Sequence, residues 1–440
     1  MLNVLANRTY RHLFLAQVIA LIGTGLATVA LSLLAYDLAG ADAGAVLGTA
    51  LAIKMIAYVG VAPIAAAFAE RLPRRTMLVA LDLIRAAVAF LLPFVTQVWE
   101  IYVLIFVLQS ASAAFTPTFQ ATIPDVLPDE KEYTRALSLS RLAYDMESVV
   151  SPMLAAALLT LISFHSLFAG TAIGFIASAA LVVSVLLPSP TPSEPRGIYD
   201  RTTRGIRIYI ATPRLRGLLA ITFAVAAASA MVIVNTVVLV QSTFGLSQRS
   251  TALAFAAFGA GSMIAALVLP RLLESTPDRT AMLAGGAMLT VGLLLGALIP
   301  SFYLLLVLWF AIGVGYSLAQ TPSGRLLRRS SNPEDRPALF AAQFALSHAC
   351  WLITYPVAGW LGPAAGLPAT FLALAMTAGS ALAIALWVWP TEDPESLEHT
   401  HDNLPEDHPH LAAAGRTIDG HRHSHAFVID NIHPEWPRPL

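Results

Sequence analysis

Cysteine and charge are what this sequence has least of. The single cysteine, Cys350, excludes an internal disulfide and any site built from several cysteines. Charged residues make up 12% of the 440 positions, well below the roughly 25% of a soluble domain. Hydrophobic residues make up 57%. The phosphate-binding pattern G-x-x-x-x-G-K-[ST] is also missing, so we expect no direct drive by ATP. Together these absences predict an integral membrane protein.

Apolar stretches fill most of the chain. Each is about 20 residues long, enough for a helix to cross a hydrocarbon core of about 30 Å. The first stretch lacks a small-residue cleavage site followed by a polar domain, so we expect it to remain as a span. We predict twelve spans, at residues 12–36, 44–69, 76–97, 101–122, 136–161, 167–187, 217–240, 251–273, 280–299, 301–323, 338–361 and 368–389.

Basic residues lie almost entirely on one side of these spans. They precede span 1 and fill the connections after spans 2, 4, 6, 8 and 10, whereas the other side has little beyond Arg249. Because cytoplasmic loops carry the excess of Lys and Arg, both termini are predicted to be cytoplasmic. A Pro-rich stretch at 188–216 is predicted to be a cytoplasmic linker. It separates two halves, 1–187 and 217–389, and residues 390–440 form a polar tail.

The two halves repeat in sequence. Thr116 at the end of span 4 matches Thr321 at the end of span 10, a separation of 321 − 116 = 205, and each is followed by proline. With one gap, Pro152 in span 5 matches Pro356 in span 11. Parallel repeats joined by a linker are typical of rocking transporters with a site between the halves. We therefore predict an all-α membrane protein of twelve helices, arranged as two six-helix repeats.

Span 5 carries charges that a membrane-spanning helix rarely tolerates. Asp145 and Glu147 lie in the segment RLAYDMESVVSP, and an ionisable residue at that depth predicts a functional site. Being two positions apart, they point in different directions, so one can face a pathway while the other packs against a neighbour. Alternatively, Arg141 one turn earlier pairs with Asp145 and gives it a structural role.

Two segments resemble signatures of the major facilitator superfamily. The stretch AAFAERLPRR at 66–75 is similar to the family's loop between spans 2 and 3, although Ala66 and Pro73 replace the usual glycines. The stretch VSPMLAA at 150–156 is similar to the antiporter signature of span 5, with small residues in place of glycines. The resemblance implies the family's fold and favours export as the direction of transport. It also implies gating roles for Glu70, Arg71, Arg74, Arg75, Ser151 and Pro152.

The resemblance is incomplete in span 4. Proton-coupled drug exporters of the superfamily usually carry an arginine there, where this chain has Gln109. Among other ionisable groups, Asp82 and Arg85 lie three apart on one helix face and are expected to neutralise each other. Lys54 is expected either to reach the membrane surface or to pair with Asp37.

His348 in span 11 occupies the position equivalent to Tyr144, because 348 − 144 = 204 as 356 − 152 = 204. We therefore expect it opposite the span 5 carboxylates, able to bind a divalent ion or a proton. A core histidine bonded to a carbonyl is the alternative. The predicted transport pathway comprises Asp145, Glu147, His348, Asp37 and Gln109.

The polar tail holds eight of the eleven histidines. It is Pro-rich and cannot bury a core, so we expect it to be disordered or ordered only locally. His-x-His steps place imidazoles on one side of an extended chain, a ligand set suited to nickel, copper, cobalt or zinc. A merely solvated tail, or a cloning remnant, is the alternative. The predicted metal ligands are His399, His401, His408, His410, His421, His423, His425 and His433.

A His-rich tail behind such a membrane domain resembles the bacterial nickel-resistance exporters. That resemblance implies export of a divalent metal, nickel or else cobalt or zinc, by proton antiport across the bacterial inner membrane. The expected partners are the metal, protons and the lipid bilayer, with no nucleic acid, no catalytic cofactor and a monomeric state. Two alternatives stay open: an exporter of an organic solute such as a siderophore or drug, and a metal receptor that transports nothing. We expect no enzyme, because no nucleophile, base and orienting group cluster together.

Overall fold

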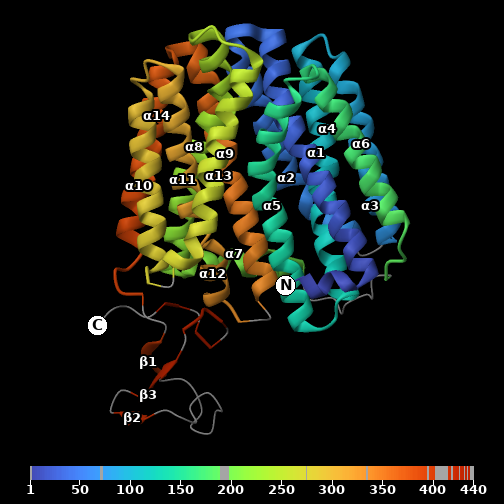
Figure 1. Cartoon of the computed structure of the whole chain (residues 1–440). Helices are drawn as coiled ribbons and strands as arrows, with labels where there is room; N and C mark the ends of the chain where they lie inside the picture. Colours follow the sequence, from blue (N-terminus) through green and yellow to red (C-terminus); the bar gives the residue numbers. More distant parts are fainter. Residues whose placement is uncertain are drawn as a thin grey trace.

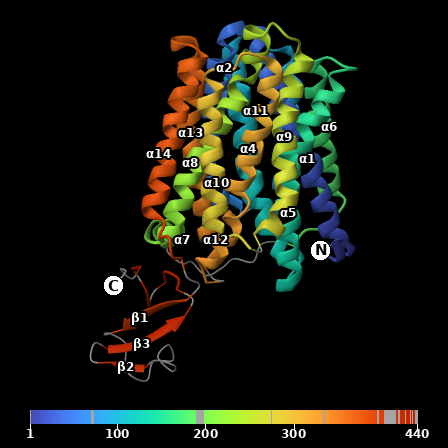
Figure 2. The same ribbon diagram turned by 60° about the vertical axis from the view of Figure 1, so that its left-hand side comes forward.

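The computed structural model describes residues 2–69, 73–188, 198–273, 275–332, 335–393, 396–401, 415–417, 420–425, 427–430, 432–433 and 435–436. Within them, twelve long helices run side by side between two ends (Figures 1 and 2). All twelve predicted spans are found. The helices are α1 (Arg8–Ala39), α2 (Ala43–Ala69), α3 (Arg74–Leu91), α4 (Val98–Val126), α5 (Glu130–Leu158), α6 (Phe164–Val183), α8 (Pro213–Val237), α9 (Gln248–Leu272), α10 (Asp278–Gly296), α11 (Phe302–Gln320), α13 (Arg336–Ala365) and α14 (Leu367–Val388).

Short elements join or extend these helices. Both chain ends lie at the same end of the bundle, as the distribution of basic residues predicts (Figure 1). The short helical elements are η1 (Leu2–Ala6), η2 (Gly40–Asp42), η3 (Leu92–Phe94), α7 (Ile198–Ala211), η4 (Val238–Thr243) and α12 (Ser323–Arg329).

Ten segments of the described chain are long and apolar enough to cross a membrane, the first of them covering both α1 and α2. Helix α5 does not qualify, because its sequence carries the charges noted above. It nevertheless runs the length of the bundle beside the others (Figure 1). Its start is fixed by Asp129, whose side chain accepts a hydrogen bond from the Glu132 backbone N–H at 3.0 Å. A polar helix within an apolar bundle is a candidate position for a functional site.

The most extensive contacts between the halves are those of α2 with α13 and of α5 with α9, and α8 also touches α1 and α2. Near the end away from the termini, α2 and α13 approach so closely that only glycine fits. A Cβ on Gly359 would lie 2.5 Å from the Gly44 carbonyl oxygen, and one on Gly48 would lie 2.8 Å from Gly359 Cα. Such contacts allow two helix backbones to pack directly against each other.

Hydrogen bonds between described residues of the two halves gather at this same end, which we call the outer end. Ser242 donates to the Tyr36 hydroxyl at 3.1 Å, and Trp360 Nε1 donates to Thr49 at 2.9 Å. Arg249 donates to the carbonyls at the end of α5, at 3.2 and 3.0 Å. The halves are therefore joined at the outer end.

The tail departs from the all-helical pattern. Strands β1 (Leu397–His401), β2 (Gly415–Thr417) and β3 (Gly420–His425) form an antiparallel sheet in the order β1-β3-β2. It lies below the last six long helices, outside the bundle (Figures 1 and 2). The expectation of local order is met because alternating polar residues suit an exposed ladder, in which the backbone groups pair with one another.

Candidate functional site

Asp82 and Arg85 of α3 carry opposite charges that neutralise each other. They form an ion pair, and Ser178 of α6 donates to Asp82 at 2.7 Å. The guanidinium lies over the rings of Phe115 and Phe175, 4.0 and 4.5 Å from their centroids. As expected, the two charges compensate each other, and the aromatic faces add cation–π contacts. This pair ties α3 to α4 and α6, and it leaves no charge to offer a ligand.

Two other membrane charges are not neutralised in this way. Lys54 of α2 and Glu147 of α5 interact electrostatically, yet neither forms a hydrogen bond or an ion pair with any described residue. Both side chains are only partly buried. A charge inside a membrane is costly unless water, a proton or a ligand compensates it. We therefore take these two residues as the core of the central site.

Helix α1 shapes the position of Glu147. A Cβ on Gly25 would lie 3.4 Å from Glu147 Cγ and only 2.2 Å from Ser151 Cβ. The missing side chain thus allows α5 to pack directly on α1. Ser151 also donates to the Ile22 carbonyl at 3.5 Å, a long hydrogen bond. The carboxylate of Glu147 is consequently held between α1 and the interior of the bundle.

Lys54 lines a small, mainly apolar cavity within the first half. The cavity holds about 30 Å³, and its polar lining residues are Thr24, Thr28, Lys54, Gln109 and Ser112. The predicted pathway residue Gln109 of α4 therefore lies around the same space as a lysine from α2. Lys54 thus brings a basic group to the lining of this cavity, although span 4 itself offers none. Lys54 was expected either to reach the membrane surface or to pair with Asp37. Its electrostatic partner is instead Glu147.

His348 meets the first half through α2. Its ring stacks on Tyr58, with centroids 5.0 Å apart and planes 5° from parallel, and Lys54 Nζ lies 5.8 Å from the Tyr58 centroid. His348 Nδ1 donates to the Phe344 carbonyl at 2.6 Å, as expected for the alternative interpretation of a core histidine bonded to a carbonyl. The other ring nitrogen, Nε2, is then the one able to take a proton or a metal. Helix α13 packs along α2, and α5 packs along α9. The position of His348 opposite the span 5 carboxylates remains a prediction.

Aromatic rings surround His348. Phe344 lies 4.0 Å and Trp351 lies 6.4 Å from it, centroid to centroid. Trp351 is fixed by donating to Ser229 of α8 at 2.9 Å. The central site thus has a charged wall from the first half and an aromatic wall from the second. Sequence reasoning did not identify Tyr58, Phe344 or Trp351, although their recurrence on α2 and α13 at helical spacing was a usable signal.

The remaining predicted pathway and gating residues lie elsewhere or are not described. Asp37 is exposed near the end of α1. Arg74 forms an ion pair with Asp125 at the end of α4, and Arg75 donates to the Val183 carbonyl of α6, so both bind within their own half. Glu70 and Arg71 lie outside the described residues, as do the side chains of Asp145 and Pro152. Gating remains a prediction for this group.

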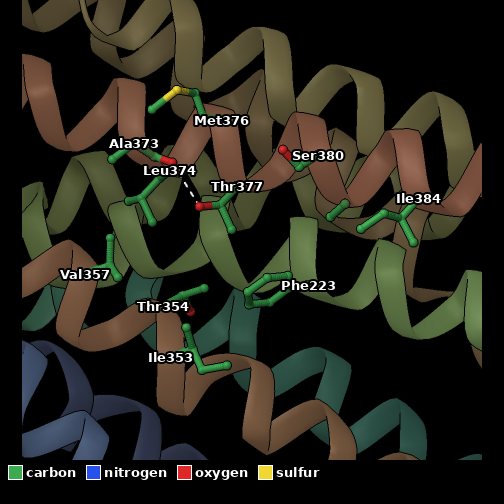
Figure 3. A pocket seen from close by; sticks show the side chains of 11 residues that line it. Phe223, Ile353, Thr354, Val357, Ala373, Leu374, Met376, Thr377, Ser380 and Ile384 are labelled. Carbon is green, nitrogen blue, oxygen red and sulfur yellow. Dashed lines mark hydrogen bonds between the residues drawn. The ribbon is translucent and has the colours of Figure 1, made fainter.

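An open groove of about 410 Å³ lies between α8, α13 and α14 (Figure 3). Ile353, Met376 and Ile384 line it and are more than half exposed. The Thr377 hydroxyl, which lines the groove, already donates a hydrogen bond to the Ala373 carbonyl at 2.9 Å. An apolar groove on the outside of a membrane bundle faces lipid chains, so we do not assign it to the transport pathway.

The tail strands arrange several of the predicted metal ligands. In the ladder, His399 pairs with His423 and His401 pairs with His421. Because alternate positions of a strand share a face, these four positions belong to one face of the sheet. His425 pairs with Leu397, whereas His408 and His410 lie outside the described residues. Among the residues that the structure describes, no group of three or more His, Cys, Asp or Glu side chains is arranged to hold a metal.

His433 differs from the other tail histidines. It is 4% exposed, its ring packs edge-on against Phe427, and Nδ1 lies 3.0 Å from the Asp430 carboxylate. It therefore contributes to a packed cluster and is separate from the sheet.

Two six-helix halves of membrane-spanning length, with partly buried charges on helices of the first half, are the arrangement of a polytopic membrane transporter. A profile of the Major Facilitator Superfamily matches residues 13–216 and 218–418. The chain therefore belongs to the major facilitator superfamily. Members of this family are transporters and not enzymes, and they need no catalytic cofactor.

Individual relatives are distant. The chain is 24% identical over 218 residues to an uncharacterized MFS-type transporter, YfiS, of Bacillus subtilis (strain 168), a match that covers 48% of this chain and 51% of that protein. It is 25% identical over 152 residues to macrolide efflux protein A of Streptococcus pyogenes, covering 32% and 37%. The chain thus spans about half or less of the length of these relatives.

Solved structures extend the likeness over nearly the whole bundle. A bacterial homologue of the human lysosomal transporter Spinster, in an inward-facing and unoccupied conformation, superposes with a TM-score of 0.69 at 14% identity. That match covers 86% of this chain and 96% of the other. The nucleoside transporter NupG gives 0.66 at 13% identity, covering 87% and 100%. At such identities the likeness establishes the fold alone.

Proposed function

We propose that this chain is a secondary active exporter of a divalent transition-metal ion, with nickel first and cobalt or zinc next. It would work by proton antiport across a bacterial cytoplasmic membrane and confer metal tolerance. The observation that carries the proposal is the strand register that pairs His399 with His423 and His401 with His421. Neutral imidazoles are ligands that nickel and zinc accept readily. The sheet lies at the end where both termini, and thus the cytoplasm, are expected.

Within the membrane, Glu147 is proposed to exchange its proton for the cation. Its carboxylate has no hydrogen-bond partner among the described residues, so a proton or a cation can bind it without breaking an existing contact. Lys54 stabilises the ionised carboxylate while the site is empty. His348 offers Nε2 from the second half. Asp145 remains a predicted second carboxylate of the pathway, and Asp37 and Gln109 remain predicted members of it.

The proposed cycle starts with the outer end closed. In that state the contacts between α2 and α13 and those of Arg249 block release to the outside, so a cation enters from the cytoplasmic end. Rocking then separates the glycine contact of Gly48 with Gly359 and opens the outer end. Proton entry from outside displaces the cation from Glu147. The protonated site returns, and the proton leaves to the cytoplasm.

Export of an organic amphiphile is the second candidate. The rings around His348, Tyr58 of the first half and Phe344 and Trp351 of the second, favour it, because such rings bind apolar and cationic organic groups. The likeness to macrolide efflux proteins points the same way. Under this hypothesis the tail histidines play no part in transport.

Inverted membrane vesicles test the proposal. With an acid interior, vesicles holding the full chain should take up radioactive nickel, and a protonophore should abolish uptake. A chain truncated after Pro390 should take up nickel with a higher KM. Absence of nickel uptake together with proton-driven uptake of an organic cation dye would replace the metal proposal with the second candidate. Nickel binding without uptake of either compound would favour a metal receptor.

A further inference from the structure

The tail returns to the second half immediately after the last long helix. Asp393, five residues beyond α14, forms ion pairs with Arg214 at 3.2 Å and with Arg329 at 3.3 Å. Arg214 begins α8, and Arg329 ends α12. The indole of Trp389 also donates to Asp393 at 3.4 Å. The first attachment of the tail is therefore a carboxylate held between two arginines at the cytoplasmic end.

A second attachment lies beyond the histidine-rich sheet. Phe427 packs against His433 and Trp436, with ring centroids 4.8 and 5.1 Å away. Arg214 joins this cluster: its guanidinium lies 5.0 Å from the Trp436 centroid, and it donates to the Phe427 carbonyl at 3.1 Å. Arg214 and Phe427 are each 3% exposed. One buried arginine thus binds both ends of the tail.

A tight turn prepares this cluster for docking. Asp430 accepts hydrogen bonds from the backbone N–H groups of Ile432 and His433, at 2.8 and 2.7 Å. The Asp430 N–H in turn donates to the His433 carbonyl at 3.1 Å, and Asn332 donates to its carboxylate at 3.4 Å. Asn332 lies four residues before the start of α13. The turn therefore presents His433 and Phe427 to the second half with its polar groups already satisfied.

Both attachments fall on elements of the second half: α8, α12 and the segment before α13. We call Arg214, Arg329, Asp393, Phe427, His433 and Trp436 the dock. We infer that the dock is a permanent mount for the tail. The stretch of chain that carries the histidine-rich sheet is then fixed to the second half at both of its ends. A terminal segment of this kind would be poorly ordered without such ties. His433 is then a positioning residue of the mount and not a metal ligand.

The mount has a consequence for transport that rests on the proposed function. When the halves rock, a sheet fixed to one half alone moves with that half. Ions captured by the sheet are then released beside the second half's side of the cytoplasmic opening, at a constant distance from it. A freely moving tail would spread the same ligands over a much larger volume and lower their effective concentration at the entrance.

The first experiment measures docking without any metal. Hydrogen exchange of the full chain in lipid nanodiscs should report the amides of 397–401 and 420–425. Phe427→Ala removes a buried aromatic anchor and Trp436→Ala a partly buried one, so exchange in both strands should accelerate about tenfold or more. Glu435→Ala, an exposed neighbour, and Trp387→Ala, which is 86% exposed on α14, are the matched controls and should leave exchange unchanged. Unchanged exchange in both anchor variants would overturn the mount.

The second experiment measures nickel uptake into inverted vesicles. Trp436→Ala should raise KM toward that of the chain truncated after Pro390 and leave kcat unchanged. His433→Ala should behave like Trp436→Ala, whereas His399→Ala combined with His423→Ala should raise KM without faster strand exchange. If truncation raises KM but Trp436→Ala does not, capture is independent of the mount and the inference fails. Absence of nickel uptake by the unaltered chain would reject the proposed function, while the exchange experiment still decides the docking.

Discussion

The two halves share a fold and a sequence repeat, yet they keep their charges in different places. The first half carries Lys54, Asp82, Arg85 and Glu147 within its membrane helices, and Arg141 and Asp145, whose side chains are outside the described ones, also lie on α5. In the second half, His348 is the one basic or acidic side chain far from a helix end. Its other charges, such as Arg214 and Asp278, stand at the ends of helices.

This difference indicates a division of labour after duplication. Charges inside the membrane are retained only where they act or are fully paired. Among its described side chains, the first half has one neutralised pair, Asp82 with Arg85, and one pair that a ligand could still approach, Lys54 with Glu147. The second half contributes an aromatic wall to the central site and uses its terminal charges to hold the tail. The predictions below test whether ion coupling really resides in the first half alone.

The largest effect is expected from Glu147→Gln. The amide keeps the volume and loses the ability to exchange a proton, so proton-driven uptake into inverted vesicles should fall about a hundredfold or more. Glu100→Gln is the control, because that carboxylate lies at the outer start of α4, where it accepts from the Thr96 and Gln97 backbone. A Glu147 variant that transports at the full rate would show that coupling does not depend on Glu147, and Asp145 would become the candidate carboxylate.

Gly359→Leu should have the next largest effect. It places a side chain where a Cβ is already 2.5 Å from the Gly44 carbonyl, so closure of the outer end is penalised by about 1–3 kcal/mol. That shifts the population toward the outward-open state roughly five- to hundredfold. Thiol labelling of Ser242→Cys in a Cys350→Ser background measures the shift. Gly60→Leu on α2, where a Cβ would meet nothing within 4 Å, is the control and should label like the parent.

Lys54→Gln should lower turnover about tenfold, within the usual range for coupled sites. Without the ammonium, the empty site no longer favours the ionised form of Glu147, so the pH dependence of transport should change together with its rate. Lys54→Arg keeps the charge and should restore the pH profile. A rate and profile identical to those of the unaltered chain would show that Glu147 works without a cationic neighbour.

Much of the architecture was predictable from the sequence, because helix length and hydropathy are local properties. The twelve spans and the placement of both termini at one end followed from these. The pairing of Asp82 with Arg85 followed as well, since partners three residues apart on a helix must meet. The resemblance in the loop at 66–75 correctly indicated the family.

The central site was less predictable, because its contacts depend on which helices pack together. His348 was expected opposite α5, and its contact with Tyr58 was not foreseen because it depends on the packing of α13 along α2. Glu147 reaches its position because α1 has a glycine at 25, which no periodicity reveals. The dock joins residues 179 and 213 positions apart, and hydrophobic patterning carries no information about partners at that distance. The His-x-His steps predicted a shared face, but the pairing of β1 with β3 required the register.

The smallest effect is expected in the tail, at Asp430. Burial opposes its charge, but hydrogen bonds from the His433 and Ile432 backbone and the nearby His433 imidazole lower the pKa of this carboxyl below its ordinary 3.8. A lowered pKa means that the ionised form supports the docked state; this support is complete above about pH 4 and is lost as the pH falls through the lowered value. Asp430→Asn should therefore speed exchange in β1 and β3 only about two- to threefold at pH 7, as expected for one partly exposed contact.

The Asp430 result also sharpens the contrast between the halves. Because the dock lies outside the membrane, Asp430→Asn should leave the kcat of transport and its pH profile unchanged, whereas Lys54→Gln changes both. If Asp430→Asn lowered kcat as much as Lys54→Gln does, charges at the end of the second half would take part in coupling. The division between an ion-coupling half and a tail-bearing half would then be wrong.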